Sequence, residues 1–149
     1  MSKQKKIVSI VMILLLVAAI GGWYTYSEYN RPLASMTETK AEITINAIDL
    51  ISAFEKDPIN SNQLYIDKII EVEGVLKEST ADDLGLYTLS LGEESEMSSV
   101  RCSVDSVSTA AAAQLKKGDF VKIKGVCSGF TPDELLGSDV TLVRCAINN

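Results

Sequence analysis

The pattern of apolar and polar residues separates a continuous apolar segment near the start of the chain from a longer region of alternating positions. Residues Ile7–Tyr26 include no charged side chain. As an α-helix this run is about 30 Å long, which matches the hydrocarbon core of a bilayer. Three aromatic residues of the kind that favour the membrane interface stand at its end, namely Trp23, Tyr24 and Tyr26. The pattern predicts one transmembrane helix.

Lysines before this run predict its orientation. Lys3, Lys5 and Lys6 precede the apolar residues, and lysines beside a transmembrane helix remain in the cytoplasm. We therefore expect a single-pass membrane protein with its N-terminus in the cytoplasm and its C-terminal domain outside. A cleaved signal peptide is the alternative, because Ala19-Ile20-Gly21 resembles a small-x-small cleavage site. Both interpretations export the domain.

Three regions follow from this pattern. Residues 1–27 form the membrane anchor or signal segment, residues 28–42 a polar stalk, and residues 43–149 a folded domain. The domain opens with a short extended piece and then Asn46, a residue type that often caps a helix. Apolar residues recur after it at helical spacing: Ala47, Leu50, Ile51 and Phe54. Asp57-Pro58 is expected to end this helix, and a second short helix is expected over residues 60–65.

Beyond these helices the apolar residues alternate with polar ones, which is typical of half-buried strands. Five strands are predicted, over residues 70–76, 87–91, 100–104, 121–127 and 140–147. The last strand has an ambiguous phase because Leu142 and Val143 are both apolar, and a β-bulge would resolve it.

An alanine-rich run interrupts the strands between the third and the fourth. Residues 109–115 favour a helix because alanine is the best helix former, with Ser106 or Ser108 as its cap and Gly118 as its stop. Three strands, a helix and two more strands predict a mainly β fold. It is a five-stranded Greek-key barrel of the OB-fold type, with a helix between strands three and four.

Charge and composition restrict the chemistry of the domain. All 20 acidic residues and 11 of the 14 basic residues follow the apolar run, so this part carries a net charge near −9. A field of that sign repels phosphate backbones. The chain has no histidine, which removes the commonest general base and metal ligand. We therefore expect no enzyme, no cofactor and no metal site.

Several stretches taken together resemble the bacterial tRNA-anticodon-like family of OB-fold proteins. Residues 65–74 (YIDKIIEVEG) resemble its first barrel strand, and residues 100–103 (VRCS) resemble its third. Residues 115–130 (LKKGDFVKIKGVCSGF) resemble its helix exit and fourth strand, and the closing Cys145 also fits. The resemblance covers residues 44–147. It implies an OB fold with nucleic-acid-binding relatives, and it implies no known activity.

Three cysteines fall on predicted strands: Cys102, Cys127 and Cys145. Disulfides persist outside the cytoplasm, and strands four and five are expected neighbours. We therefore expect a Cys127–Cys145 disulfide, which would stabilise the fold by about 3 kcal/mol in the chain-entropy model. Another pairing and three buried, reduced thiols are the alternatives. A redox or zinc site is not expected, since the chain lacks a Cys-x-x-Cys motif.

Four basic residues are predicted to point away from the core on the third to fifth strands: Arg101, Lys122, Lys124 and Arg144. They form a candidate ligand face for an anionic ligand or partner. The alternative is that Lys122 and Lys124 make ordinary cross-strand ion pairs with Glu71 and Glu73.

These observations predict a membrane-anchored, exported OB-fold binding or interaction module without enzymatic activity. Loops 81–85 and 131–138 are the two variable loops that flank the binding face of such a barrel. Besides the membrane itself, the expected partners are an envelope protein, a peptide or a small ligand. The alternative is a protein that binds single-stranded nucleic acid, which requires a basic groove with exposed aromatic residues.

Overall fold

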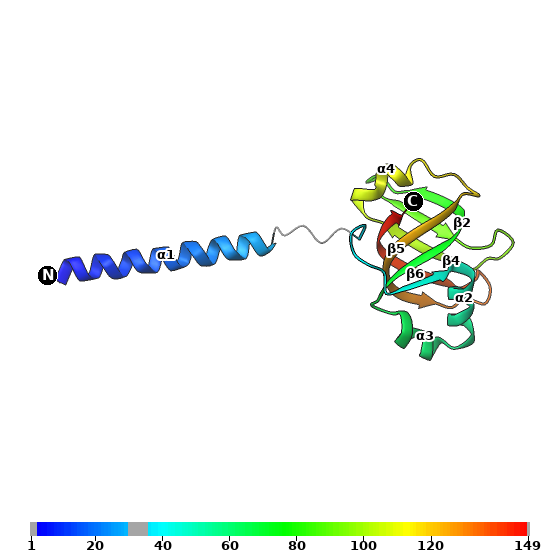
Figure 1. Cartoon of the computed structure of the whole chain (residues 1–149), viewed down its shortest axis with the longest axis horizontal. Coiled ribbons are helices and arrows are strands. Elements are labelled where there is room, and N and C mark those ends of the chain that lie inside the picture. The colour runs from blue at the N-terminus through cyan, green and yellow to red at the C-terminus, as the bar shows by residue number, and fades with distance from the viewer. Residues whose placement is uncertain (1–2, 30–35, 149) are drawn as a thin grey trace. The chain divides into compact units, whose positions relative to one another are not determined.

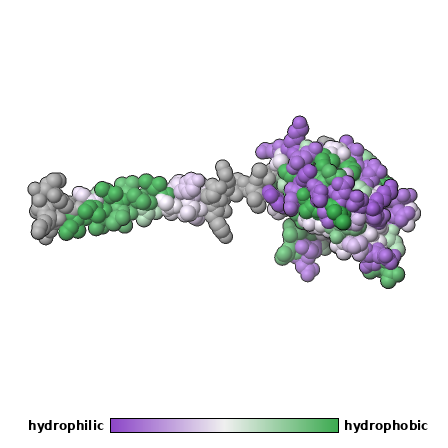
Figure 2. Space-filling model, turned by 90° about the horizontal axis from the view of Figure 1, so that it is seen from below, coloured by the Kyte–Doolittle hydropathy of each residue, from purple (hydrophilic) through white to green (hydrophobic). Residues whose placement is uncertain are grey.

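The apolar run near the N-terminus forms one continuous helix in the computed structural model, which describes residues 3–29 and 36–148. Helix α1 (Lys3–Tyr29) includes a stretch of 21 residues, Ile7–Ser27, that is long and apolar enough to cross a membrane. The side chains of residues 7–27 are exposed on every face, and Figure 2 shows apolar residues along much of this stretch. A helix that is apolar all round is typical of a membrane span.

Five strands close into a barrel in the second unit of the chain, Ala34–Asn149 (Figure 1). They are β2 (Ile69–Ala81), β3 (Tyr87–Leu91), β4 (Ser99–Val104), β5 (Phe120–Thr131) and β6 (Asp139–Asn148). The order around the barrel is β2-β3-β4-β6-β5, and β5 pairs back with β2. Neighbouring barrel strands are antiparallel except for the parallel pair β4 and β6. This closed, mixed, five-stranded barrel is consistent with the OB-fold, and the predicted fold class is confirmed.

A short strand and two helices precede the barrel. Strand β1 (Ile43–Asn46) pairs parallel with β2. The Asn46 side chain accepts a hydrogen bond from the Ile48 N–H at 3.0 Å and caps α2 (Ala47–Lys56), as predicted. Helix α3 (Pro58–Tyr65) begins two residues before its predicted start, because Asp57 caps it through the Asn60 N–H at 3.0 Å.

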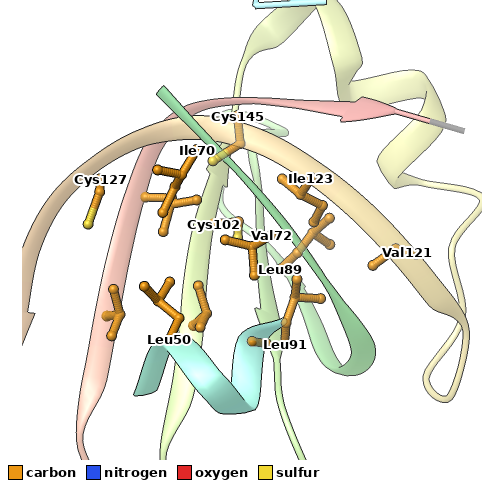
Figure 3. Close-up of a cluster of buried hydrophobic side chains, with 14 of the residues drawn as sticks. Leu50, Ile70, Val72, Leu89, Leu91, Cys102, Val121, Ile123, Cys127 and Cys145 are labelled. Atoms are coloured by element: carbon orange, nitrogen blue, oxygen red, sulfur yellow. The ribbon is translucent and has the colours of Figure 1, made fainter. Parts of the chain in front are cut away.

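The core lies inside the barrel and packs against α2 (Figure 3). Strand residues at every second position supply most of it, including Ile70, Val72, Leu89 and Ile123, all of which are fully buried. Helix α2 closes one end of the barrel with its buried apolar stripe: Ala47, Leu50, Ile51 and Phe54. The Phe54 ring stacks on Phe130 of β5 with ring centroids 5.1 Å apart. The helical period read from the sequence therefore marks the surface that packs on the barrel.

The helix between β4 and β5 is shorter than predicted. A 3-10 turn, η1 (Ser106–Ser108), leads into α4 (Thr109–Ala112), and neither Ser106 nor Ser108 caps it with its side chain. Ser108 occupies the N-cap position of α4, as predicted, but its side chain makes no capping hydrogen bond. The ends close instead with tight backbone bonds, such as Leu115 N–H to the Ala112 carbonyl at 3.2 Å. Tertiary context limits the helix despite its alanine content.

A bulge in β6 resolves the phase that the sequence left ambiguous. Cys102 lies opposite Leu142 and Val104 lies opposite Cys145, so β6 uses three residues where β4 uses two. Arg144 has a φ of 55°, which is the left-handed conformation that a bulge residue can adopt. The bulge returns Cys145 to the core. It sits against Gly125, where an added Cβ would lie 2.6 Å from the Cys145 Sγ.

Candidate functional site

The outer face of β3 and β4 is the surface on which OB barrels usually bind their ligands. The side chains that point outward there are Thr88, Ser90, Arg101 and Ser103. Loops 82–86 and 132–138 lie at opposite ends of this face, since Thr88 pairs with Ser103 and Ser99 pairs with Asp139. The face is therefore rich in hydroxyl groups and carries one cation.

Aromatic side chains do not contribute to this face within the described part of the domain. Phe54 is buried, while Tyr65, Tyr87 and Phe130 are half-buried and pack against the core. Phe120 is exposed, but it pairs with Val75 on β2, on another wall of the barrel. A stack of bases on exposed rings, as single-strand binders use, has no counterpart in the described residues of β3 and β4.

The four predicted ligand-face cations lie on β4, β5 and β6, and Arg101 and Lys122 form ion pairs with neighbouring carboxylates. Arg101 Nε is 2.7 Å from a carboxylate oxygen of Asp139, and Lys122 Nζ is 2.9 Å from a carboxylate oxygen of Glu73. Glu73 raises the pKa of Lys122. The alternative of a cross-strand ion pair is therefore the arrangement found for Lys122.

Lys124 has a role that its sequence position did not reveal. It pairs with Glu71 in the strand register, but its side chain is buried. Its Nζ donates hydrogen bonds to the carbonyls of Thr37 and Thr39, at 3.3 and 2.8 Å. These hydrogen bonds hold the segment before β1, which includes Thr37 and Thr39, against the barrel. No local pattern in the sequence links position 124 with positions 37 and 39, so this role could not be predicted.

Arg144 lies apart from the other cations, at the bulge of β6. It lines a surface hollow of about 300 Å³ together with Leu86, Ser103 and Asp105. This hollow is at the end of the barrel that carries loop 82–86. Arg101 pairs with Thr141 near the opposite end of β6. The structure thus distributes the predicted basic residues over the barrel.

The three cysteines are buried and free, so the predicted Cys127–Cys145 disulfide is not supported. Cys127 lies opposite Leu142 in the β5–β6 register, and the β6 bulge places Cys145 beside Cys102 instead. The bulge thus places Leu142, and not Cys145, opposite Cys127 across the seam. A hydrogen bond with Cys102, together with burial, raises the pKa of Cys145, and burial raises the pKa of Cys127 to about 11.

A groove of about 540 Å³ opens at the end of the barrel that α2 closes. Its walls come from α2, the start of α3, loop 92–98 and loop 132–138. Four carboxylates line it: Glu55, Glu96, Asp133 and Glu134. Apolar side chains lie among them, including Met97, Phe130 and Leu135. We call this surface the acidic groove, since the described residues that line it include no lysine or arginine.

Hydrogen bonds join the two loops of the acidic groove to each other and to α2. The Ser138 N–H donates to Ser98 Oγ at 3.0 Å, and Ser98 Oγ donates to Glu55 Oε1 at 3.1 Å. Gly137 has a φ of 85°, and an added Cβ there would lie 2.4 Å from the carbonyl carbon of Met97. Glycine is therefore required for this close approach, and the groove is a built part of the fold.

Sequence reasoning missed the acidic groove, although two signals were present. Leu135-Leu136 stands within a stretch otherwise typical of a polar loop, and Glu93, Glu94 and Glu96 crowd the loop after β3. Nothing local in the sequence indicates that the two loops meet. In the described ranges, no group of three or more metal-ligating side chains is arranged to hold a metal ion.

A solved structure of a "putative nucleic acid-binding lipoprotein" from Klebsiella pneumoniae subsp. pneumoniae is similar to this chain. The two are 14% identical with a TM-score of 0.54, and the match covers 70% of this chain and 91% of that one. At this identity the likeness shows a shared fold.

Two further solved structures match a little more than half of the chain. An OBody bound to hen egg-white lysozyme is 16% identical with a TM-score of 0.43, covering 58% of this chain and 86% of that one. The asparaginyl-tRNA synthetase of Entamoeba histolytica is 13% identical with a TM-score of 0.40, covering 54% of this chain and 20% of the synthetase. No curated protein matches the chain in sequence.

The family comparison extends over nearly the whole chain. The tRNA_anti-like model matches residues 1–147. The matched range includes α1 and the six strands of the sheet. It ends one residue before the end of β6. The resemblance noted in the strands of the sequence is thus confirmed, and the chain belongs to the tRNA_anti-like family.

Proposed function

We propose that this chain is a non-enzymatic binding module of the bacterial envelope, anchored by α1, whose OB domain binds a protein partner outside the cytoplasm. The acidic groove carries this proposal. It is a preformed hollow with mixed apolar and charged lining, at one end of the usual OB binding face. Its chemistry suits a polypeptide better than a phosphate backbone.

Export is supported by α1 and the residues before it. The helix includes 21 residues apolar enough to cross a membrane, and Lys3, Lys5 and Lys6 favour a cytoplasmic N-terminus. The similar Klebsiella protein is described as a lipoprotein. The first cysteine here is Cys102, so α1 would hold the domain at the membrane where that protein has a lipid.

Nucleic-acid binding is the second candidate, because the similar Klebsiella protein is described in those words. Two observations argue against nucleic-acid binding. The residues that follow the apolar run carry a net charge near −9. The outward side chains of β3 and β4 are hydroxyl groups and one arginine that is already in an ion pair. Binding to a phosphate backbone needs several cations that release counterions. The described cations Arg101 and Lys122 already lie in ion pairs.

A crosslinking experiment in intact envelopes tests the proposal. The full chain, with a reporter fused to its C-terminus, is expressed in bacteria and treated with a crosslinker that does not cross the inner membrane. We expect the reporter to be active only outside the cytoplasm and a discrete protein adduct to form. A cytoplasmic reporter would overturn the proposed location, and adducts with nucleic acid alone would support the second candidate.

A further inference from the structure

We propose that the acidic groove binds a basic, apolar peptide segment of a partner protein. This inference rests on the function proposed above and names the chemistry of the partner. It follows from three features of the groove: its exposed apolar side chains, its uncompensated carboxylates and its preformed loops.

Apolar side chains of the groove face solvent instead of the core. Leu135 is 84% exposed and Met97 is 63% exposed, and Leu136, which stands beside the groove lining, is 71% exposed. They belong to two loops that contact each other at Gly137 and Ser98. Apolar groups gathered on a surface and rimmed by polar residues mark interaction sites. A partner that covers them gains about 25 cal/mol for each Å² of apolar surface removed from water.

The loop that carries the two leucines is held in shape from within. Asp133 Oδ1 accepts hydrogen bonds from the N–H groups of Leu135 and Leu136, at 2.8 and 2.9 Å. These bonds lower the pKa of Asp133, so its carboxylate stays charged at neutral pH. The turn displays both side chains outward. A preformed loop loses less conformational entropy when it binds a partner.

The carboxylates of the groove lack cationic partners in the described part of the chain. Glu55 accepts a hydrogen bond from Ser98, and the nearby Lys77 Nζ is bound to the backbone carbonyls of Glu96 and Ser98, at 2.5 and 3.0 Å. None of Glu55, Glu96, Asp133 and Glu134 forms an ion pair with a described side chain. A neighbouring hollow of about 260 Å³ adds Glu93 and shares Glu55 and Glu96. The negative surface therefore continues along α2.

Charge complementarity selects the occupant. Apolar contacts at Met97, Phe130 and Leu135 together with a carboxylate rim fit a segment in which apolar and basic side chains alternate. Anionic lipid and nucleic acid present negative charge to the same rim and are disfavoured. A volume of about 540 Å³ accommodates a few side chains, within the usual range of about 300–1,000 Å³ for preformed pockets.

Fluorescence anisotropy of labelled peptides tests this inference on the full chain in nanodiscs. The probe is a short peptide of alternating lysine and leucine, and the comparison peptides alternate lysine with serine and glutamate with leucine. We expect the lysine–leucine peptide to bind most tightly and to weaken with added salt. If the lysine–serine peptide binds as tightly as the lysine–leucine peptide, the attraction is non-specific and comes from charge alone. That result would overturn the inference.

Matched variants locate the binding. Leu135→Ser and Glu134→Gln should each weaken the lysine–leucine peptide, and the double variant should weaken it about tenfold or more. Leu84→Ser is the control, because Leu84 is also 84% exposed but belongs to loop 82–86. All these side chains are on the surface, so the variants should fold. Unchanged affinity in the double variant, or an equal loss in Leu84→Ser, would contradict the proposal.

Two further measurements, envelope crosslinking and hydrogen exchange, distinguish peptide binding in the groove from binding at another surface and from contact with lipid. If Leu135→Ser leaves the envelope crosslink intact, the proposed function stands and the groove is not its site. Hydrogen exchange of residues 132–138 is compared between nanodiscs and detergent, without peptide. Protection by the bilayer alone would show that the leucines contact lipid, which would overturn the peptide assignment.

Discussion

The two ends of the barrel are closed by different structures. At one end α2 inserts Leu50 and Phe54, both fully buried, and Phe54 stacks on Phe130. At the other end η1 and α4 cover the opening with short turns, and Ala112 is the buried residue of α4 (Figure 1). The acidic groove forms at the α2 end. The end with the larger buried side chains is thus also the end that carries the groove.

Truncating the aromatic anchor should have the largest effect on stability. Phe54→Ala removes a fully buried ring and should lower the free energy of unfolding by about 3–5 kcal/mol. At the other end, Ala112→Gly should cost only about 1 kcal/mol. Urea denaturation of the two variants, followed by circular dichroism, measures both. Equal losses at the two ends would contradict the comparison.

The stability of the protein at high pH tests the burial of the Cys127 thiol in the barrel. The folded protein raises the pKa of Cys127 from an ordinary value of 9.0 to about 11. The unfolded chain therefore releases this proton first, and stability is complete below about pH 9 and falls as the pH rises towards 11. For reduced protein we expect the Cys127 thiol to contribute about 2–3 kcal/mol to this fall.

The matched control for the pH experiment is Cys127→Ala. Its stability should fall less steeply between pH 9 and pH 11 than that of the wild type, because the Cys127 thiol is the group that the variant lacks. The Cys145 pKa is also raised, so a smaller decline should remain. Parallel curves for wild type and variant would show that Cys127 is not protected as the structure indicates. Mass spectrometry without reductant reports whether any disulfide forms.

A comparison of two lysines on β5 tests how far the α2 end depends on the segment before β1. Lys124→Met leaves the carbonyls of Thr37 and Thr39 without this donor and should cost about 1–3 kcal/mol. Lys122→Met is the control, since its ion pair with Glu73 is on the surface and contributes little.

Hydrogen exchange shows where the Lys124→Met variant loosens. Residues 36–42 should exchange faster, while α2 should stay protected if its stability comes from Phe54 and the barrel. Faster exchange throughout α2 would show that the α2 end depends on residues 36–42. It would contradict the view that Phe54 and the barrel alone stabilise this end.

Most of the fold could be predicted because period and turn chemistry are local. The alternation of apolar and polar residues in β3 and the apolar stripe of α2 each depend on a few neighbouring residues. Asn46 caps α2, as its residue type suggests. The ambiguous Leu142-Val143 pair correctly indicated a bulge. Ser108 stands at the N-cap of α4, as its residue type suggests, but its side chain makes no capping hydrogen bond.

The site could not be predicted to the same extent because it depends on contacts between distant residues. Ser98 bonds with Ser138 across 40 positions, and Lys124 reaches Thr39 across 85. The neighbours of Cys145 depend on such contacts as well, since a single extra residue in β6 sets the register of the strand.

The central claim is that this OB domain binds protein and not nucleic acid. The most direct measurement is a titration of the full chain in nanodiscs with a labelled single-stranded oligonucleotide at low salt, where phosphate binding is strongest. The account predicts no change in anisotropy, while the lysine–leucine peptide binds under the same conditions. A rise in anisotropy with the oligonucleotide that disappears as salt is added would contradict it.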